Sequence, residues 1–272
     1  MTDTSALARE LTDAYANRRV ITVPPSGRPG GLDLMAGYAV EAELVRMRRA
    51  GGHKTVGLKV AFPNRALWRV LKLETLAWAH MYDDTVQYAK ANHATLSVGR
   101  MFSPKIEPEI VFKLKRAPAA AGQPEAVLEA VEWIALGYEI IDCVYADWKF
   151  QPADFVASFG LHAGLIVGDP TLLKPADIPS LFEKLASFNA TLAKDGQLVA
   201  QGGGKNVLQN PALCLAELAA AISRHPTAEP LAAGDVITSG ALTDGQPIAG
   251  GQTWTATVSG LDLAALSTHI TA

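Results

Sequence analysis

Hydrophobic residues follow a helical period in the first fifty residues of the chain. Leu7 and Leu11 belong to a series with spacings of three and four residues, which predicts a first helix. A second helix is predicted over residues 34–50, because Asp33 can cap its start and its last turn is basic. Residues 1–52 are therefore predicted to form a helical N-terminal cap or an oligomer contact.

The pattern changes to strands after residue 53, where apolar and polar residues alternate. The dipeptide Asp195–Gly196 predicts a hairpin between two of these strands. The predicted strands cover residues 54–61, 105–114, 137–144, 161–168, 187–194, 197–201, 235–242 and 253–260. The predicted helices among them cover residues 64–73, 124–136 and 211–222.

This order of elements predicts an α+β fold with a β-rich core and helices on its outside. The sequence shows no internal repeat and no low-complexity linker, so we expect one domain over residues 1–272. Within it, residues 1–52 are the helical cap and residues 53–272 are the β-rich core.

Composition and charge exclude several classes of partner. The 272 residues are 49% hydrophobic and carry a formal net charge of −3, which does not favour binding to nucleic acid or to an anionic membrane surface. No apolar run approaches the length of about 18 residues that is typical of a transmembrane helix. Cys143 and Cys214 lie in apolar stretches without metal-site spacing, which predicts reduced core thiols in a cytoplasmic protein.

Three glutamates are the first candidates for chemistry. Glu107 and Glu109 stand two residues apart in a predicted strand, so both side chains leave the same face. Glu139 lies in a later strand that follows the helix predicted over residues 124–136. If the three converge, they form an oxygen-only site of the kind that suits Mg²⁺ or Mn²⁺. If they do not, they are ordinary carboxylates on a solvated strand face.

Other candidates are weaker when each is taken alone. Lys59 lies in an apolar strand and is either a functional buried amine or a lysine that extends to solvent. Ser239 and Gly240 follow a strand and offer a hydroxyl and backbone N–H groups to a carboxylate, or form a simple turn. His80 and His162 stand in separate segments without metal-ligand spacing.

Six stretches in order resemble one known family along nearly the whole chain. They are AGYAVEAELV, GLKVA, SPKIEPEIVFKL, GYEIIDCVYADWK, NVLQNPALCLAELA and LAAGDVITSGAL. On these stretches the chain resembles the 2-oxopent-4-enoate hydratase and 4-oxalocrotonate decarboxylase family, within the fumarylacetoacetate hydrolase-like superfamily. The resemblance implies a mixed β-fold, a homo-oligomer and a role in the catabolism of aromatic compounds.

The resemblance also implies the site. Glu107, Glu109 and Glu139 are expected to bind Mg²⁺ or Mn²⁺, and Lys59 is expected to be catalytic and to contact the substrate. The expected substrate is a small 2-oxo or 2-hydroxydienoic acid. Further expected substrate contacts are Ser158, Phe159, Leu161, Ser239 and Gly240.

The chain departs from the family on the substrate side. Residues 158–161 read Ser-Phe-Gly-Leu in place of a polar run, Cys143–Val144 replace a serine-arginine pair, and Glu41 replaces a glutamine. If residues 158–161 line the site, the loss of polar groups predicts a preference for a substrate with an apolar far end. The alternative is that this segment packs in the core away from the site.

The first expectation is therefore a metal-dependent lyase that hydrates a 2-hydroxydienoate. Decarboxylation of a 2-oxo-3-enedioate comes second, and hydrolysis of an acylpyruvate comes third, with His80 or His162 as its only candidate base. A binding or structural protein that has lost the chemistry is the non-enzymatic alternative.

Overall fold

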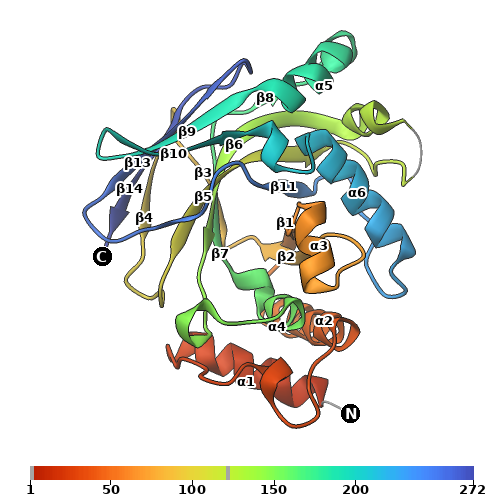
Figure 1. Cartoon of the computed structure of the whole chain (residues 1–272), viewed down its shortest axis with the longest axis vertical. Coiled ribbons are helices and arrows are strands. Elements are labelled where there is room, and N and C mark those ends of the chain that lie inside the picture. Colours follow the sequence, from red (N-terminus) through yellow and green to blue (C-terminus); the bar gives the residue numbers. More distant parts are fainter. Residues whose placement is uncertain (1–2, 121–122) are drawn as a thin grey trace.

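The computed structural model describes residues 3–120 and 123–272, and it contains two β-sheets with helices below and beside them (Figure 1). Residues 1–2 of the predicted cap lie outside the described residues. The helices are α1 (Thr4–Ala16), α2 (Leu34–Ala50), α3 (Arg65–Leu71), α4 (Pro152–Ala157), α5 (Ile178–Ser187) and α6 (Pro211–Arg224). The strands are β1 (Thr55–Ala61), β2 (Ala77–Tyr82), β3 (Val86–Tyr88), β4 (His93–Ser97), β5 (Lys105–Leu114), β6 (Val131–Ile141), β7 (His162–Val167), β8 (Thr171–Leu172), β9 (Asn189–Lys194), β10 (Gln197–Gly203), β11 (Val236–Ala241), β12 (Gln246–Pro247), β13 (Thr253–Ser259) and β14 (Leu266–Thr271).

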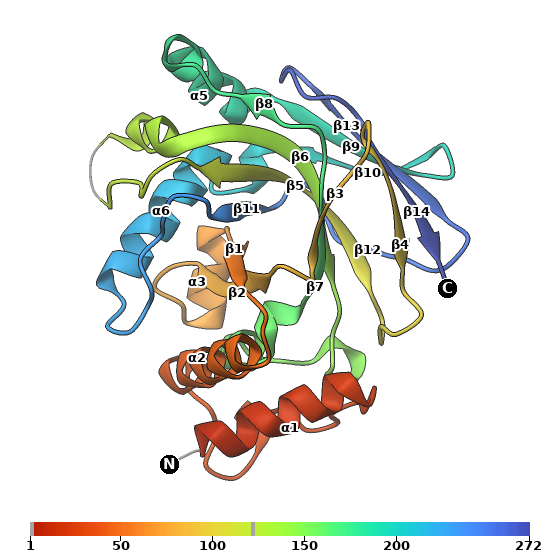
Figure 2. The ribbon, with the colours of Figure 1, turned by 180° about the vertical axis from the view of Figure 1, so that it is seen from behind.

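The larger sheet holds the central strands of the fold. Its order is β2-β1-β11-β5-β6-β7-β3, with β12 paired to β5 and β8 paired to β6. The smaller sheet has the order β10-β9-β13-β14-β4 and contains the hairpin predicted at Asp195–Gly196. Figure 2 shows α6 and the smaller sheet on opposite sides of β5 and β6. The α+β fold with outer helices is thus confirmed.

Capping residues determine where α2 and α6 begin, and both starts agree with the sequence prediction. The side chain of Asp33 accepts a hydrogen bond from Ala36 N at 2.8 Å, and α2 begins at the next residue, as expected. Asn210 caps α6 in the same way, with Pro211 at the first helical position. At the opposite end of the molecule from the smaller sheet, α2 packs against α1 and α4 (Figure 1).

The prediction of one helix over residues 124–136 is wrong, because residues 131–136 form part of a strand. Residues 124–130 form a 3₁₀-helix, and the chain then enters β6, which merges with the strand predicted over residues 137–144. The reason is burial on both faces of β6, where only Glu132 is exposed, so that apolar residues do not alternate with polar ones. Among the described residues, the 3₁₀-helix over residues 124–130 is the one helical segment between β5 and β6, and the two strands pair directly.

Two further expectations concern the core and the membrane. Cys143 and Cys214 are free and buried, as predicted. Across residues 3–120 and 123–272, every helix is too short or too polar to cross a bilayer.

Candidate active site

The pairing of β5 with β6 brings the three predicted carboxylates together. Glu107 lies directly opposite Glu139 in the antiparallel register, and Glu109 follows two residues later on the same face of β5. Each of the three offers one carboxylate oxygen, and these oxygens lie within 4.8 Å of one another. We call Glu107, Glu109 and Glu139 the acidic triad.

A glycine on β11 holds one member of the acidic triad in place. Gly240 N donates a hydrogen bond to Glu109 Oε2 at 2.7 Å. Gly240 has a φ of +95°, and an added Cβ would lie 2.5 Å from the Pro63 ring. Only glycine fits this backbone conformation so close to a neighbour. The backbone N–H of Gly240 therefore contacts a carboxylate of the acidic triad, while its expected contact with a substrate stays a prediction.

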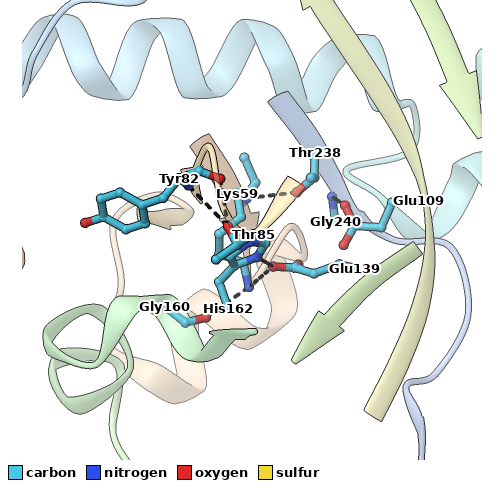
Figure 3. A network of polar contacts seen from close by, with 10 residues as sticks. Lys59, Tyr82, Thr85, Glu109, Glu139, Gly160, His162, Thr238 and Gly240 are labelled. Carbon is cyan, nitrogen blue, oxygen red and sulfur yellow. Dashed lines mark hydrogen bonds and ion pairs between the residues drawn. The ribbon is translucent and has the colours of Figure 1, made fainter. Parts of the chain in front are cut away.

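Two basic side chains surround Glu139 (Figure 3). Lys59 Nζ lies 3.2 Å from Glu139 Oε1 and donates a hydrogen bond to the carbonyl oxygen of Gly160 at 3.1 Å. His162 Nδ1 lies 3.0 Å from the same Glu139 oxygen, while His162 Nε2 lies 3.1 Å from Thr85 Oγ1. The side chain of Lys59 is only 3% exposed, so its charge is held inside the protein rather than in solvent.

Burial and mutual repulsion set the ionisation of the acidic triad. Burial, with the charges of Glu139 and Glu107, raises the pKa of Glu109 well above its ordinary value. Burial and the charge of Glu139 raise the pKa of Glu107 to about 7. Burial also opposes ionisation of Glu139, but Lys59 and His162 outweigh it and hold the pKa of Glu139 below its ordinary value.

The donor atoms of the acidic triad fit a divalent cation. Among the described residues, Glu109 Oε1 and Glu139 Oε2 are buried and have no hydrogen-bond partner. Leaving a buried polar atom unsatisfied costs about 1–3 kcal/mol, and more when the group is charged. Hard oxygen ligands are those that Mg²⁺ and Mn²⁺ prefer. A cation bound between these carboxylates would satisfy both orphaned oxygens.

A cavity of about 320 Å³ opens beside Glu107 and Lys59. Its walls are mostly apolar, and one part of them, the aromatic wall, consists of Phe62, Trp148, Phe150 and Phe155, with Leu161 beside them. Lys59 Nζ lies 4.8 Å from the ring centroid of Phe155. A second ammonium group, that of Lys105, lies 4.0 Å above the ring of Trp148. The cavity therefore offers two positive charges and an apolar wall to a small acid.

The predicted substrate contacts divide into two groups. Leu161 and Gly240 line the cavity. Ser158 Oγ instead donates a hydrogen bond to a carbonyl of α4 at 2.6 Å, and Ser239 Oγ accepts one from the backbone of β5 at 3.2 Å. The ring of Phe159 packs edge-on against two tyrosines. Of residues 158–161, only Leu161 lines this cavity.

The other departures from the family lie outside this cavity. Cys143 and Val144 are buried in the hydrophobic core. Glu41 accepts hydrogen bonds from His80 and lines a different cavity.

Sequence reasoning missed three of the residues that shape the site. Lys105 shares a face of β5 with Glu107 and Glu109, and the alternation that grouped the two acids would have included it. Trp148 and Phe155 stand in short irregular and helical segments, where no periodic signal marks them.

Comparison with known proteins found no matching family model. A 2-keto-4-pentenoate hydratase of Burkholderia vietnamiensis is 28% identical over 259 residues, which cover 94% of each chain. The structure of a 4-oxalocrotonate decarboxylase from Pseudomonas putida G7, complexed with magnesium and adipate, superposes with a TM-score of 0.86 at 26% identity and covers 99% of this chain and 98% of that one.

A more distant structure shows how widely the fold is shared. The fumarylpyruvate hydrolase of Pseudomonas aeruginosa, in complex with Mn²⁺ and pyruvate, matches 79% of this chain and 88% of its own with a TM-score of 0.60 at 16% identity. With this architecture and these relatives, the chain is a homologue of the 2-keto-4-pentenoate hydratases and 4-oxalocrotonate decarboxylases, which are lyases by name, and it has the fold of fumarylacetoacetate hydrolase-like proteins.

Proposed function

We propose that the chain is a divalent-metal-dependent hydratase of a small 2-hydroxydienoate or 2-oxo-enoate. The observation that carries the proposal is the convergence of three carboxylates, two of them buried and each of those two with an orphaned oxygen, beside a cavity that Lys59 lines. The names of the relatives support the same reaction class, since they include hydratases that act on 2-keto-4-pentenoate and 2-hydroxypent-2,4-dienoate.

In this proposal the acidic triad holds Mg²⁺ or Mn²⁺, which supplies Lewis acidity toward the oxygens of a 2-oxo acid. Lys59 is the catalytic side chain. An ammonium group has three N–H donors, and two point to Glu139 and Gly160, so one remains for the substrate. That donor delivers the proton that converts a dienol to an enone. The aromatic side chains contact the apolar part of the substrate. A water molecule then adds to the enone and completes the hydration.

Decarboxylation is the second candidate, and Lys105 is the observation that favours it. Its ammonium group lies on the cavity and can pair with a second carboxylate at the far end of a 2-oxo-3-enedioate. The related decarboxylase structure contains adipate, which is a dicarboxylate. Against this, the aromatic wall favours an apolar tail, which is the preference predicted from residues 158–161.

The geometry does not favour hydrolysis of an acylpyruvate or a protein without catalytic activity. Hydrolysis of an acylpyruvate needs a free base near the substrate, but both ring nitrogens of His162 already have partners, and His80 lines another cavity. A protein that had lost its chemistry would have no reason to keep Glu109 and Glu139 buried, each with an unpaired oxygen.

The test is a screen of 2-oxo acids and dienols for a change in ultraviolet absorbance, with and without Mg²⁺. We expect Mg²⁺-dependent consumption of a five- or six-carbon monocarboxylate dienol without release of CO₂. A higher kcat/KM for the dicarboxylate analogue, with release of CO₂, would make decarboxylation the function. Absence of turnover together with absence of Mg²⁺ binding would overturn both.

The proposal also covers the localisation, the domain organisation and the oligomeric state of the protein. We propose that the protein acts in the cytoplasm, as its free buried thiols favour. We also propose that residues 1–272 form one domain, with residues 1–52 as its cap, and that the protein is a homo-oligomer. Analytical ultracentrifugation tests the last of these directly.

A further inference from the structure

A second cavity, of about 340 Å³, lies between α2, β2 and the segment that follows α6. Successive side chains of a strand point to opposite faces, so Trp78 and His80 leave β2 on one side and Ala79 leaves it on the other. Trp78 and His80 line this cavity. Ala79 pairs with Lys59 of β1 and lies with it beside Gly160. The strand β2 therefore forms a wall between this cavity and the candidate active site.

A buried carboxylate orients the imidazole of His80 in this second cavity. Glu41 Oε1 lies 2.7 Å from His80 Nδ1 and also accepts a hydrogen bond from His80 N at 3.0 Å. A carboxylate can only accept, so Nδ1 carries a proton. Burial opposes the charged ring, but the hydrogen bond and charge of Glu41 outweigh it and raise the pKa of His80. When the ring is protonated, Nε2 is a second donor, and no residue in the described part of the chain accepts a hydrogen bond from it.

A second imidazole in the same cavity also lacks an acceptor. His225 Nδ1 accepts a hydrogen bond from Thr227 N at 3.4 Å, which places the proton of the neutral ring on Nε2. His225 Nε2 is buried and has no hydrogen-bond partner among the described residues. A buried donor without an acceptor is unfavourable, so an acceptor supplied by a ligand would stabilise the protein.

The floor of the cavity is aromatic. The ring centroids of Tyr38 and Trp78 are 4.6 Å apart, and that of His225 lies 4.7 Å from Tyr38 and 5.5 Å from Trp78. Aromatic faces and edges favour a flat, unsaturated ligand over a compact polar one. At the rim, Arg49 is already held by Glu229 through two hydrogen bonds, so the rim adds little net charge.

We propose that this cavity is a second ligand site, which binds a small planar monocarboxylate with its carboxylate on His80 Nε2 and His225 Nε2 and its ring on Trp78 and Tyr38. The carboxylate oxygens of such a ligand can accept hydrogen bonds from the two imidazole donors that lack partners. Its planar ring can pack against the aromatic side chains of the cavity floor. The site lies behind β2 and shares no lining residue with the cavity beside the acidic triad. The proposal does not depend on the reaction proposed above.

Benzoate is the probe, because it combines one carboxylate with a planar ring. Calorimetric titration of the Mg²⁺-loaded protein is compared across the wild type, His225→Phe and Lys105→Met. His225→Phe keeps the aromatic packing and removes one donor, so we expect benzoate affinity to fall by about tenfold or more. Lys105→Met alters only the other cavity and should leave the affinity unchanged.

A second variant and a second readout guard against a folding defect. His80→Gln tests the other donor, and the imidazole ¹⁵N resonances of His80 and His225 in the wild type should move on addition of benzoate. Absence of benzoate binding would overturn the proposal. So would binding that Lys105→Met weakens while His225→Phe and the two imidazole resonances stay unaffected, because that result would place benzoate in the candidate active site.

Discussion

Removal of the Lys59 charge should destabilise the metal-free protein much more than the metal-bound protein. Lys59 Nζ lies 3.2 Å from Glu139 Oε1, and both side chains are almost completely buried. At this distance the attraction is worth about 5 kcal/mol with an effective dielectric constant of about 20. Removing one partner of such a buried pair typically costs about 3–5 kcal/mol, because the other charge is left uncompensated.

The expected result can be measured by thermal unfolding. For a chain of this size about 1 kcal/mol corresponds to about 2 °C, so Lys59→Met should lower Tm in EDTA by about 6–10 °C. If Mg²⁺ binds the acidic triad, it replaces the lost positive charge, so the increase in Tm on adding Mg²⁺ should be larger in Lys59→Met than in the wild type. Turnover should fall far more than Mg²⁺ affinity, because Lys59 is not a ligand in the proposed site.

The matched control is the same substitution at an exposed ion pair. Lys149 Nζ lies 3.1 Å from Asp147, and the two side chains are 79% and 75% exposed. Lys149→Met should change stability by at most about 1 kcal/mol and should leave the response to Mg²⁺ unchanged. If Lys59→Met lowers Tm no more than this control, or gains no more from Mg²⁺ than the wild type, then Lys59 does not balance the acidic triad.

Three further predictions follow from the same geometry. Replacing any member of the acidic triad by alanine should abolish Mg²⁺-dependent activity and leave the circular dichroism spectrum unchanged. Gly160→Ala should cost at least about 1–2 kcal/mol of stability, since φ is +59° there, and should also lower kcat because the new Cβ would lie 2.9 Å from Lys59 Cδ. Glu41→Gln should lower the pKa of His80 measured by NMR. Because the folded pKa of His80 lies above the ordinary value of 6.5, the stability that Glu41 provides is fully present below pH 6.5 and is lost as the pH rises through the folded pKa.

Each of these has a result that would contradict it. A triad variant with the wild-type Mg²⁺ titration would show that its residue is not a ligand. Gly160→Ala with wild-type kcat would mean that the position of Lys59 tolerates displacement. For Glu41→Gln, the urea unfolding free energy should differ most from the wild type at about pH 5.5 and least at about pH 9; the reverse order would mean that Glu41 does not stabilise the charged imidazole.

Local signals in the sequence were sufficient for α2, α6 and the hairpin of the smaller sheet, but they did not reveal β2 or α4 beside the site. The caps at Asp33 and Asn210 and the Asp195–Gly196 turn each act within a few residues, so their effect is visible without tertiary structure. The segment before Glu139 was misread because β6 is covered on both faces, which removes the alternation that marks a strand. Burial of this kind is a property of the folded sheet, not of the segment.

The partners of the acidic triad could not be predicted for a related reason. The same-face placement of Glu107 and Glu109 needs only the period of a strand. The contacts of Glu139 with Lys59 and His162 join three different strands, and their register depends on pairings far apart in the chain. The resemblance supplied Lys59 and the triad, but it assigned no role to His162 or Lys105.

Pro108 lies between two members of the acidic triad in the middle of a central strand, where proline is rare because it cannot donate a ladder hydrogen bond. Its carbonyl oxygen accepts a hydrogen bond from Leu242 N at 2.8 Å, so the residue is still tied to the neighbouring segment. A slip of β5 by one residue would move the side chains of Glu107 and Glu109 to the opposite face of the sheet. It would also place the nitrogen of Pro108, which carries no hydrogen, where the neighbouring strand needs a hydrogen-bond donor. We therefore expect Pro108 to disfavour misaligned pairing of β5 during folding, because a misaligned strand would lose a ladder hydrogen bond at this residue.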